Sequence, residues 1–407
     1  MSGGVRGNKL RTGLVIAEVA LSMALLIGAG LMLRSFAQLQ RVEPGFDSDN
    51  VVTFTAPLQF IKYSTAESRT NFINQLGDRL AEISGVQSVG GVMPLPLAGG
   101  EQYSVGSYGR VGVADDVYQA NKADYKSTLP GYFETLGIEL LAGRFLTRAD
   151  NQPEALAVAV VDQKLVDRLF GDEDPLGQKS VVDYFSGETF ALERRPVRIV
   201  GVVANVRSTS LAADSRETVY YPFVFGPWWP VTFVIRTTTD PASLLPRVRE
   251  AVIAMDPDVP ISGIATLDSY IAASMAPTRF MLALIGTFAV LALLLASLGL
   301  YGVISYSVRQ RTREIGVRVA FGATNGDVVW LLLRQGVGVA LAGIVVGVLG
   351  SLALTRVVGS LLVGVTATDP VTFVSIPLLL LVIAAVATYI PSRRAALVDP
   401  VDALRGE

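Results

Sequence analysis

The chain has 407 residues, of which 51% are hydrophobic and only 17% are charged. Soluble domains carry roughly 25% charged residues, so part of this chain is expected to contact lipid. The net charge of -2 gives no basic field for nucleic acid. The sequence contains neither Cys nor His, which excludes disulfides, thiolate nucleophiles, imidazole bases and ordinary zinc sites.

Four segments are long and apolar enough to cross a hydrocarbon core of about 30 Å, which needs about 20 helical residues. They are residues 14–33, 281–304, 336–354 and 371–390. The first apolar stretch is longer than a signal-peptide core of about 7–15 residues, so we interpret it as a retained span. Glu18 within it either suits the helix dipole near the cytoplasmic end or makes an interhelical polar contact.

Basic residues flank the four spans unevenly. Lys or Arg is frequent before the first span, between the second and third, and after the fourth, whereas only Arg356 lies between the third and fourth. Because loops rich in Lys and Arg stay in the cytoplasm, both termini are expected there. The expected segments outside the spans are 1–13 (cytoplasmic N-terminus), 34–280 (extracytoplasmic stalk and domain), 305–335 (cytoplasmic loop and entry to span three), 355–370 (external loop) and 391–407 (cytoplasmic tail).

The long segment between the first two spans has the pattern of an α/β domain with two subdomains. Strand-like runs at 51–54 and 86–92 flank residues 65–84, which show helical spacing. A similar strand–helix–strand unit occupies residues 231–264, so we expect a pseudo-repeat that forms one subdomain. A β-rich run at 198–206 lies between the two units and predicts the second subdomain.

Residues 171–180, Gly-Asp-Glu-Asp-Pro-Leu-Gly-Gln-Lys-Ser, resemble a phosphate-binding P-loop superficially. A P-loop needs four residues between its glycines and a lysine directly after the second, whereas this segment has five residues and then Gln178. We interpret it as a turn. The acidic pair Asp115-Asp116 likewise resembles a solvated turn. The sequence therefore indicates no catalytic, cofactor-binding or metal-binding residue and no enzyme activity in this chain.

Gly343, Gly347 and Ser351 are spaced by four residues and share one face of the third span. Small residues allow helices to approach closely in lipid, where hydrophobic attraction between helices is absent. We predict that this face is a helix-packing seam, within one chain or between chains, rather than a pore lining.

The loop between spans two and three has the pattern of a short amphipathic helix. Ile315, Val319 and Phe321 share one side of residues 309–321, and Gly322 stands where a helix C-cap glycine is common. A basic helix of this kind either binds anionic headgroups or docks into a protein partner. The residues by themselves favour neither interpretation.

Residues 311–323, Arg-Thr-Arg-Glu-Ile-Gly-Val-Arg-Val-Ala-Phe-Gly-Ala, closely resemble the signature loop of the FtsX/MacB-type permeases of ABC transporters. Residues 132–144, 169–177, 199–203 and 391–405 are similar to the same family, so the resemblance covers nearly the whole chain. Residues 14–22, 34–36, 44–46 and 50–52 resemble more narrowly the second half of the duplicated permeases common in acidobacteria. That likeness implies a free-standing or split second half.

This resemblance implies a MacB-like periplasmic core domain and a multi-pass protein of the bacterial inner membrane. It also implies a cytoplasmic ABC ATPase subunit that uses ATP, so that this chain itself binds no cofactor. Further implied partners are membrane lipid and a second permease half, which is either a copy of this chain or a related one. A periplasmic adaptor is an optional additional partner. The loop positions that the resemblance assigns to coupling with the ATPase are Arg311, Arg313, Glu314, Ile315, Gly316, Arg318, Val319 and Gly322.

The implied function is that of a permease subunit in an efflux or mechanotransmission complex. Outward extensions of spans one and two, at about residues 34–42 and 267–279, would carry movement to the extracytoplasmic domain. The alternative is an envelope regulator or sensor that transports nothing and instead gates a cell-wall hydrolase or a signalling partner.

Overall fold

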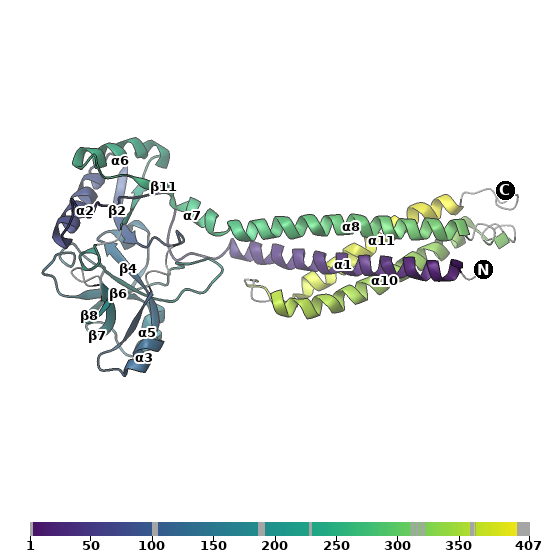
Figure 1. Ribbon diagram of the computed structural model, residues 1–407, viewed down its shortest axis with the longest axis horizontal. Coiled ribbons are helices and arrows are strands. Elements are labelled where there is room, and N and C mark those ends of the chain that lie inside the picture. The colour runs from purple at the N-terminus through teal and green to yellow at the C-terminus, as the bar shows by residue number, and fades with distance from the viewer. Residues whose placement is uncertain are drawn as a thin grey trace. The chain divides into compact units, whose positions relative to one another are not determined.

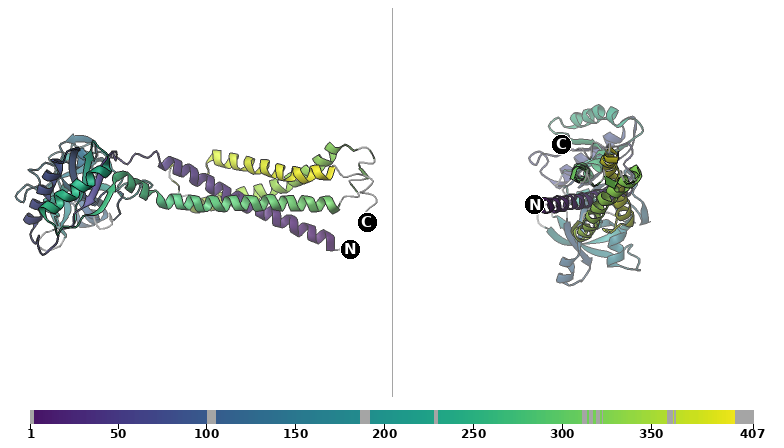
Figure 2. Two further views of the ribbon diagram at one scale, coloured as in Figure 1. Left: turned by 90° about the horizontal axis from the view of Figure 1, so that it is seen from above. Right: turned by 90° about the vertical axis from the view of Figure 1, so that its right-hand side faces the viewer.

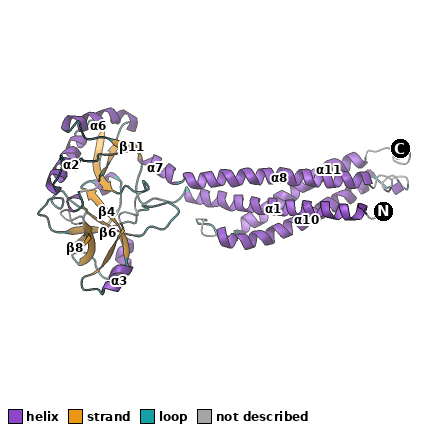
Figure 3. Cartoon of the chain, viewed as in Figure 1, coloured by secondary structure: helices purple, strands orange, loops and turns teal. Residues whose placement is uncertain are grey.

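The computed structural model describes residues 3–99, 105–185, 192–227, 230–310, 314, 317–318, 321, 323–358, 362 and 364–396. The chain divides into two compact units (Figure 1). The membrane unit consists of Met1–Arg41 and Pro277–Glu407, and the inserted domain is Val42–Ala276. In the described residues, strands occur in the inserted domain alone, whereas the membrane unit is helical (Figure 3).

Four long helices make up the membrane unit, and each is long and apolar enough to cross a membrane (Figure 2). The four predicted spans are therefore confirmed. The helices continue beyond the predicted apolar stretches and include charged flanking residues such as Arg34 and Arg309. Their bounds are α1 (Gly3–Leu39), α8 (Ala276–Gln310), α10 (Asn325–Val358) and α11 (Pro370–Ala396).

A buried stripe on α1 forms the centre of the membrane unit. Val15, Val19, Met23, Ile27 and Leu31 recur every four residues and are almost completely buried. They pack with residues of the other helices in one hydrophobic cluster. α1 lies against α10 and α11, and α10 lies against α11.

The helix α8 leaves most of its large apolar side chains exposed. In a bilayer such side chains face lipid or another protein rather than water. The residues concerned are Phe280, Met281, Leu284, Phe288, Val290, Leu291, Leu294, Leu295 and Leu298.

The inserted domain is built on one continuous sheet, and helices connect some of its consecutive strands. Along the sheet the order is β11-β1-β10-β2-β4-β3-β7-β8-β6-β9, and β5 pairs with β8. The strand β9 also pairs in parallel with β4, which closes β4, β3, β7, β8, β6 and β9 into a ring. The strands are β1 (Val51–Thr55), β2 (Val86–Met93), β3 (Val105–Arg110), β4 (Lys122–Leu129), β5 (Leu140–Gly143), β6 (Val158–Asp162), β7 (Lys179–Phe185), β8 (Leu192–Val203), β9 (Glu217–Pro222), β10 (Thr232–Thr237) and β11 (Ser262–Thr266).

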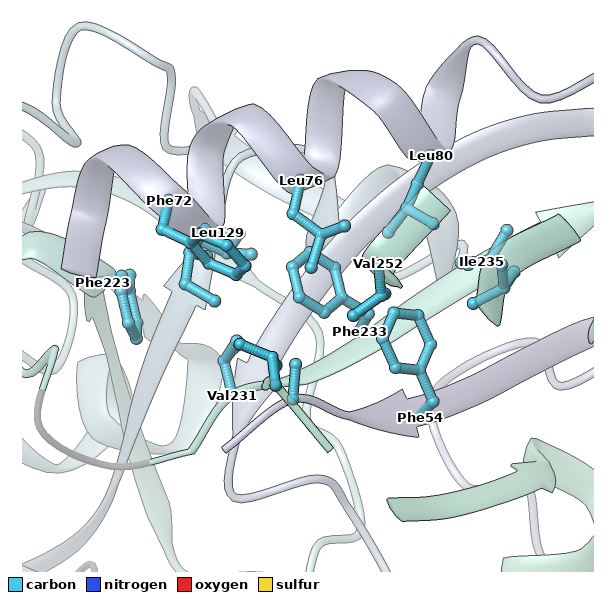
Figure 4. Packing of buried hydrophobic residues seen from close by; sticks show 14 of the residues in the cluster. Phe54, Phe72, Leu76, Leu80, Leu129, Phe223, Val231, Phe233, Ile235 and Val252 are labelled. Atoms are coloured by element: carbon cyan, nitrogen blue, oxygen red, sulfur yellow. The ribbon is translucent and has the colours of Figure 1, made fainter. Parts of the chain in front are cut away.

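The open part of the sheet forms the first predicted subdomain. Its helix α2 (Ala66–Ala81) begins at a capping box in which Thr65 and Ser68 each accept a hydrogen bond from the other's backbone N–H. Phe72, Leu76 and Leu80 recur every four residues on α2 and point into the core over β10 (Figure 4). The helix α6 (Pro241–Met255) covers the same face, so the predicted pseudo-repeat is present.

The closed ring of strands holds a second hydrophobic cluster and corresponds to the second subdomain. Tyr108, Tyr125, Ile199 and Val219 are buried in it. The two cores share the strand β4, which pairs with β3 along its first half and with β2 along its second half. The remaining helices of the domain are α3 (Asp115–Ala120), α4 (Tyr132–Thr135), α5 (Gln163–Leu169) and α7 (Leu267–Ser274).

Two local predictions need correction. Asp115 and Asp116 do not form a free turn, because they occupy the first turn of α3, where acidic side chains interact well with the helix dipole. Asp115 also accepts a hydrogen bond from Arg194 at 2.6 Å. The last strand of the pseudo-repeat begins at Ser262 rather than at residue 259. Residues 171–180 contain turns at Gly171 and Gly177, as predicted.

Candidate functional site

The small-residue face of α10 lies directly against α1. A Cβ atom on Gly343 would be 2.6 Å from the Cβ of Val19, and a Cβ on Gly347 would be 2.5 Å from the Cβ of Met23. Ser351 is buried on the same face, and its hydroxyl donates to the carbonyl oxygen of Gly347 at 2.7 Å. The three residues are thus brought together at a contact within one chain, where a larger side chain at either glycine would force the helices apart.

Other close contacts between the membrane helices lie outside the predicted seam. A Cβ on Gly336 of α10 would be 2.5 Å from the Cγ2 of Thr388 of α11. A Cβ on Gly30 of α1 would be 2.9 Å from the Cγ2 of Thr372. The sequence offers a weak signal for these, because each glycine interrupts an otherwise apolar helix, but it does not identify the partner.

Glu18 points toward α8. Its Oε2 lies 2.5 Å from the position that a Cβ on Gly299 would occupy. One turn further, the hydroxyl of Ser22 is within hydrogen-bonding distance of the carbonyl oxygens of both Glu18, at 2.7 Å, and Ala292 of α8, at 2.8 Å. The side chain of Glu18 therefore lies against α8, which is compatible with both interpretations of this residue. Ser22 is a contact residue that the sequence did not indicate.

The loop between α8 and α10 is described only in part. Glu314 and Arg318 form an ion pair at 2.9 Å, one helical turn apart, and both side chains are about half exposed. Phe321 is 88% exposed. The other positions assigned to coupling, namely Arg311, Arg313, Ile315, Gly316, Val319 and Gly322, lie outside the described residues.

The entry to α10 after this loop is fixed by a reciprocal cap. The backbone N–H of Thr324 donates to Asp327 Oδ2 at 2.9 Å, and the backbone N–H of Asp327 donates to Thr324 Oγ1 at 3.3 Å. Such a cap satisfies donors that the first turn of a helix leaves free. A defined start of α10 gives the loop a fixed end.

The end of α8 that precedes the loop makes polar contacts with the other three helices. The guanidinium of Arg11 in α1 lies 4.3 Å from the ring centre of Tyr306. The hydroxyl of Ser307 donates to Gln335 Oε1 of α10 at 3.4 Å, and Arg394 of α11 donates to the hydroxyl of Tyr301 at 3.4 Å. These contacts connect all four helices at this end.

A row of buried polar side chains crosses three strands of the inserted domain. Asp124 of β4 pairs with Thr218 of β9. Val219 of β9 pairs with Val161 of β6, so the neighbouring residues Thr218 and Asp162 also lie close to each other. All three residues are almost completely buried. Burial raises the pKa of Asp162 to about 7, and burial also raises the pKa of Asp124.

This polar row has a structural explanation. Asp162 Oδ1 accepts the backbone N–H of Leu165 at 3.0 Å and so caps α5. Asp124 lies 3.5 Å from Arg216. Among the described residues there is no group of three or more Asp, Glu, His or Cys that could hold a metal ion. Nothing in the row marks catalytic chemistry.

Four membrane-spanning helices with a large α/β domain inserted after the first define a multi-pass membrane protein with an extracytoplasmic domain. Residues 12–258 match the MacB-like periplasmic core domain, and residues 286–400 match the FtsX-like permease C-terminal domain. The chain therefore belongs to the family of FtsX/MacB-type permeases, as the sequence predicted. The narrower resemblance to duplicated permeases stays a prediction.

Several curated proteins are similar to this chain. The macrolide export ATP-binding/permease protein MacB 2 of Aeromonas hydrophila is 28% identical over 76% of this chain and 47% of its own length. The pyoverdine export ATP-binding/permease protein PvdT of Pseudomonas aeruginosa is 27% identical over 98% of this chain and 57% of its own length. The chain thus spans about half the length of the curated relatives that it matches.

Among solved structures, the periplasmic region of MacB from Actinobacillus actinomycetemcomitans aligns with 57% of this chain and 95% of its own. The identity is 16% and the TM-score is 0.37.

Proposed function

We propose that this chain is a permease subunit of an ABC-type efflux or mechanotransmission complex in the bacterial inner membrane. The observation that carries the proposal is that one chain matches both the MacB-like periplasmic core domain, over residues 12–258, and the FtsX-like permease C-terminal domain, over residues 286–400. The relatives are exporters by name. Their names do not favour the alternative, in which the chain gates a hydrolase or a signalling partner without transport.

ATP hydrolysis is assigned to a partner subunit. The relatives combine ATP binding and permease activity in their names, whereas residues 171–180, which resemble a P-loop superficially, lack its spacing and its lysine. The coupling positions Glu314 and Arg318 form an exposed ion pair on the cytoplasmic loop. An exposed, oriented pair is available for polar contacts with an ATPase.

The helices α1 and α8 suit the transmission of movement. α1 has 37 residues and α8 has 35, so each is more than 50 Å long at about 1.5 Å per residue. This exceeds the hydrocarbon thickness of about 30 Å. A continuous helix resists bending, so that displacement at one end is carried to the other.

The remaining partners and the orientation follow from charge and exposure. The basic flanks support cytoplasmic termini. The exposed apolar side chains of α8 support contact with lipid or with a second permease half, which is either a copy of this chain or a related one. A periplasmic adaptor would bind the inserted domain.

Copurification tests the proposed function. The chain is expressed with an ABC ATPase of the same genome and solubilised mildly, and the ATPase is expected to copurify with its ATP turnover raised by the permease in nanodiscs. Turnover of the ATPase alone is the reference. If a cell-wall hydrolase or a sensor kinase copurifies while no ATPase binds, the regulator alternative replaces this proposal.

A further inference from the structure

One face of α1 is fastened to the segment that leads into α11. Gly30, Arg34 and Gln38 are spaced by four residues and therefore share this face. We call their contacts with Thr372, Asp369 and Gly364 the outer contact. It belongs entirely to the membrane unit.

An ion pair lies at the centre of the outer contact. Arg34 donates through Nη1 to Asp369 Oδ2, across 335 positions of sequence. The Asp369 side chain is only 12% exposed, whereas that of Arg34 is 45% exposed. Asp369 Oδ2 also accepts the backbone N–H of Thr372 at 2.8 Å and the hydroxyl of Thr372 at 2.7 Å. The carboxylate is therefore held by the first turn of α11, and the arginine is the side chain that reaches it.

Close packing lies on both sides of the ion pair. Towards the middle of α1, Gly30 approaches Thr372 so closely that a Cβ would be 2.9 Å from its Cγ2. Towards the end of α1, a Cβ on Gly364 would be 2.5 Å from Gln38 Cγ. Gly364 has a φ of +65°, a backbone conformation that favours glycine. Gln38 can pack against Gly364 because this residue has no side chain and adopts a left-handed backbone conformation.

We propose that Arg34 and Asp369 are positioning residues that make the outer end of α1 move together with the first turn of α11. This inference rests on the proposed function, in which α1 carries movement to the inserted domain. A partly exposed ion pair contributes little to stability. Its role here is to fix the relative position of two helix ends, so that a displacement of α10 and α11 is passed on to the part of α1 beyond the membrane.

The first test uses the permease alone in nanodiscs. Spin labels are attached at Ala37→Cys on α1 and Val374→Cys on α11, which are both exposed, and the native chain has no competing Cys. We expect a narrow distribution of label distances. Arg34→Glu places two negative charges together and should broaden it more than Arg34→Gln does, and Asp369→Asn should remove that difference while keeping the helix cap. Arg34→Lys, which keeps the charge, should stay close to the native distribution.

Arg41→Glu is the matched control. It makes the same charge change near the same end of α1, at an exposed residue that forms no ion pair within the described ranges. It should leave the distribution unchanged. If Arg34→Glu also leaves it unchanged, or if Arg41→Glu broadens it equally, the outer contact does not position these helices and the inference is overturned.

The second test adds the ATPase and compares nucleotide-free and ATP-trapped complexes. Labels at Leu156→Cys in the inserted domain and Val374→Cys report movement between the units. We expect Arg34→Glu to reduce the nucleotide-dependent change in distance at least twofold while ATP turnover continues. If the native complex responds and Arg34→Glu responds equally, the positioning role is wrong. If the native complex itself shows no response, the proposed function fails, and the first test still decides whether the outer contact holds the helices.

Discussion

Gly347 of α10 and Met23 of α1 lie so close that a Cβ on the glycine would be 2.5 Å from the Cβ of the methionine. Real Cβ atoms do not approach this closely, and the backbone carbonyl of Ala20 lies on the same side, at 2.8 Å from the added atom. Neither a side-chain rotation at Met23 nor a small local shift can therefore admit a larger residue. The two helices must separate, or the substitution is not tolerated.

Gly347→Leu should destabilise the membrane unit. Overpacking of a well-filled contact typically costs about 1–3 kcal/mol, and lipid offers no hydrophobic gain in exchange. We expect a lower midpoint in thermal or denaturant unfolding in detergent. Gly350→Leu is the control, since nothing lies within 4 Å of its Cβ position on the same helix. Equal midpoints for Gly347→Leu and the native chain would show that the seam does not hold these helices.

The spans and α2 could be predicted because their signals are local. An apolar run of about 20 residues has few alternatives to a membrane helix, and Phe72, Leu76 and Leu80 mark the buried face of α2 by their spacing. The strand β4 could not be predicted, because Lys122–Leu129 has a polar sequence although seven of its eight residues are buried. Some of its polar side chains have partners far away in sequence, because Thr128 donates to the carbonyl oxygen of Tyr221 and Asp124 lies beside Arg216.

The contacts of the membrane helices were predictable to a lesser degree. The spacing of Gly343 and Gly347 indicates a close-packed face, but it does not reveal that α1 is the partner. Arg34 reads as a basic flank of span one, and Asp369 reads as a loop residue before a proline. Their pairing depends on how four helices assemble, which no periodicity in the sequence records.

Asp162 should make the stability of the inserted domain depend on pH. Burial raises its pKa from the ordinary value of 3.8 to about 7. At a pH between these two values, the carboxyl group of Asp162 therefore keeps its proton in the folded state and has lost it in the unfolded state. The stability that this proton brings is complete below about pH 4 and is lost as the pH rises through about 7. By linkage, the change is on the order of 2–4 kcal/mol.

Asp162→Asn should remove this pH dependence. An asparagine oxygen can still accept the Leu165 N–H and cap α5, but it does not titrate. We expect denaturant unfolding of the full chain in detergent to show a smaller loss of stability from pH 5 to pH 8 than the native chain shows. Asp167→Asn, at an exposed position of the same helix, is the control. A slope that Asp162→Asn leaves intact would mean that other groups carry it.

The orientation can be tested with single cysteines, because the chain has none. The exposed residues Ile61 in the inserted domain and Phe321 in the cytoplasmic loop are suitable positions, at 97% and 88% exposure. In spheroplasts, Ile61→Cys should react with an impermeant maleimide, whereas Phe321→Cys should react only after the membrane is opened. Labelling of Phe321→Cys in intact spheroplasts would contradict cytoplasmic termini.

Variants in the loop between α8 and α10 can distinguish two mechanisms, coupling to an ATPase and anchoring to headgroups. If it is a coupling helix, Arg313→Glu should weaken the partner specifically, because it places a negative charge in a contact that a positive charge made. If Gly322 is the C-cap glycine that the sequence predicts, Gly322→Val should misdirect the loop. A β-branched residue adopts a left-handed conformation poorly, at a cost on the order of 1 kcal/mol or more. The inserted domain should stay folded in both variants.

A headgroup anchor predicts a different pattern. Loss of function would then follow the total positive charge of the loop rather than the position of the change, and Arg313→Lys would be harmless.

The measurement is stimulation of ATP turnover and copurification of the ATPase, at equal permease content, for Arg313→Glu, Arg313→Lys and Gly322→Val. Arg309→Glu, the same charge change at the end of α8, serves as the comparison. Equal losses for Arg309→Glu and Arg313→Glu, with Gly322→Val fully active, would assign the loop to the membrane surface. A larger loss for Arg313→Glu, together with a loss for Gly322→Val, would assign it to the ATPase.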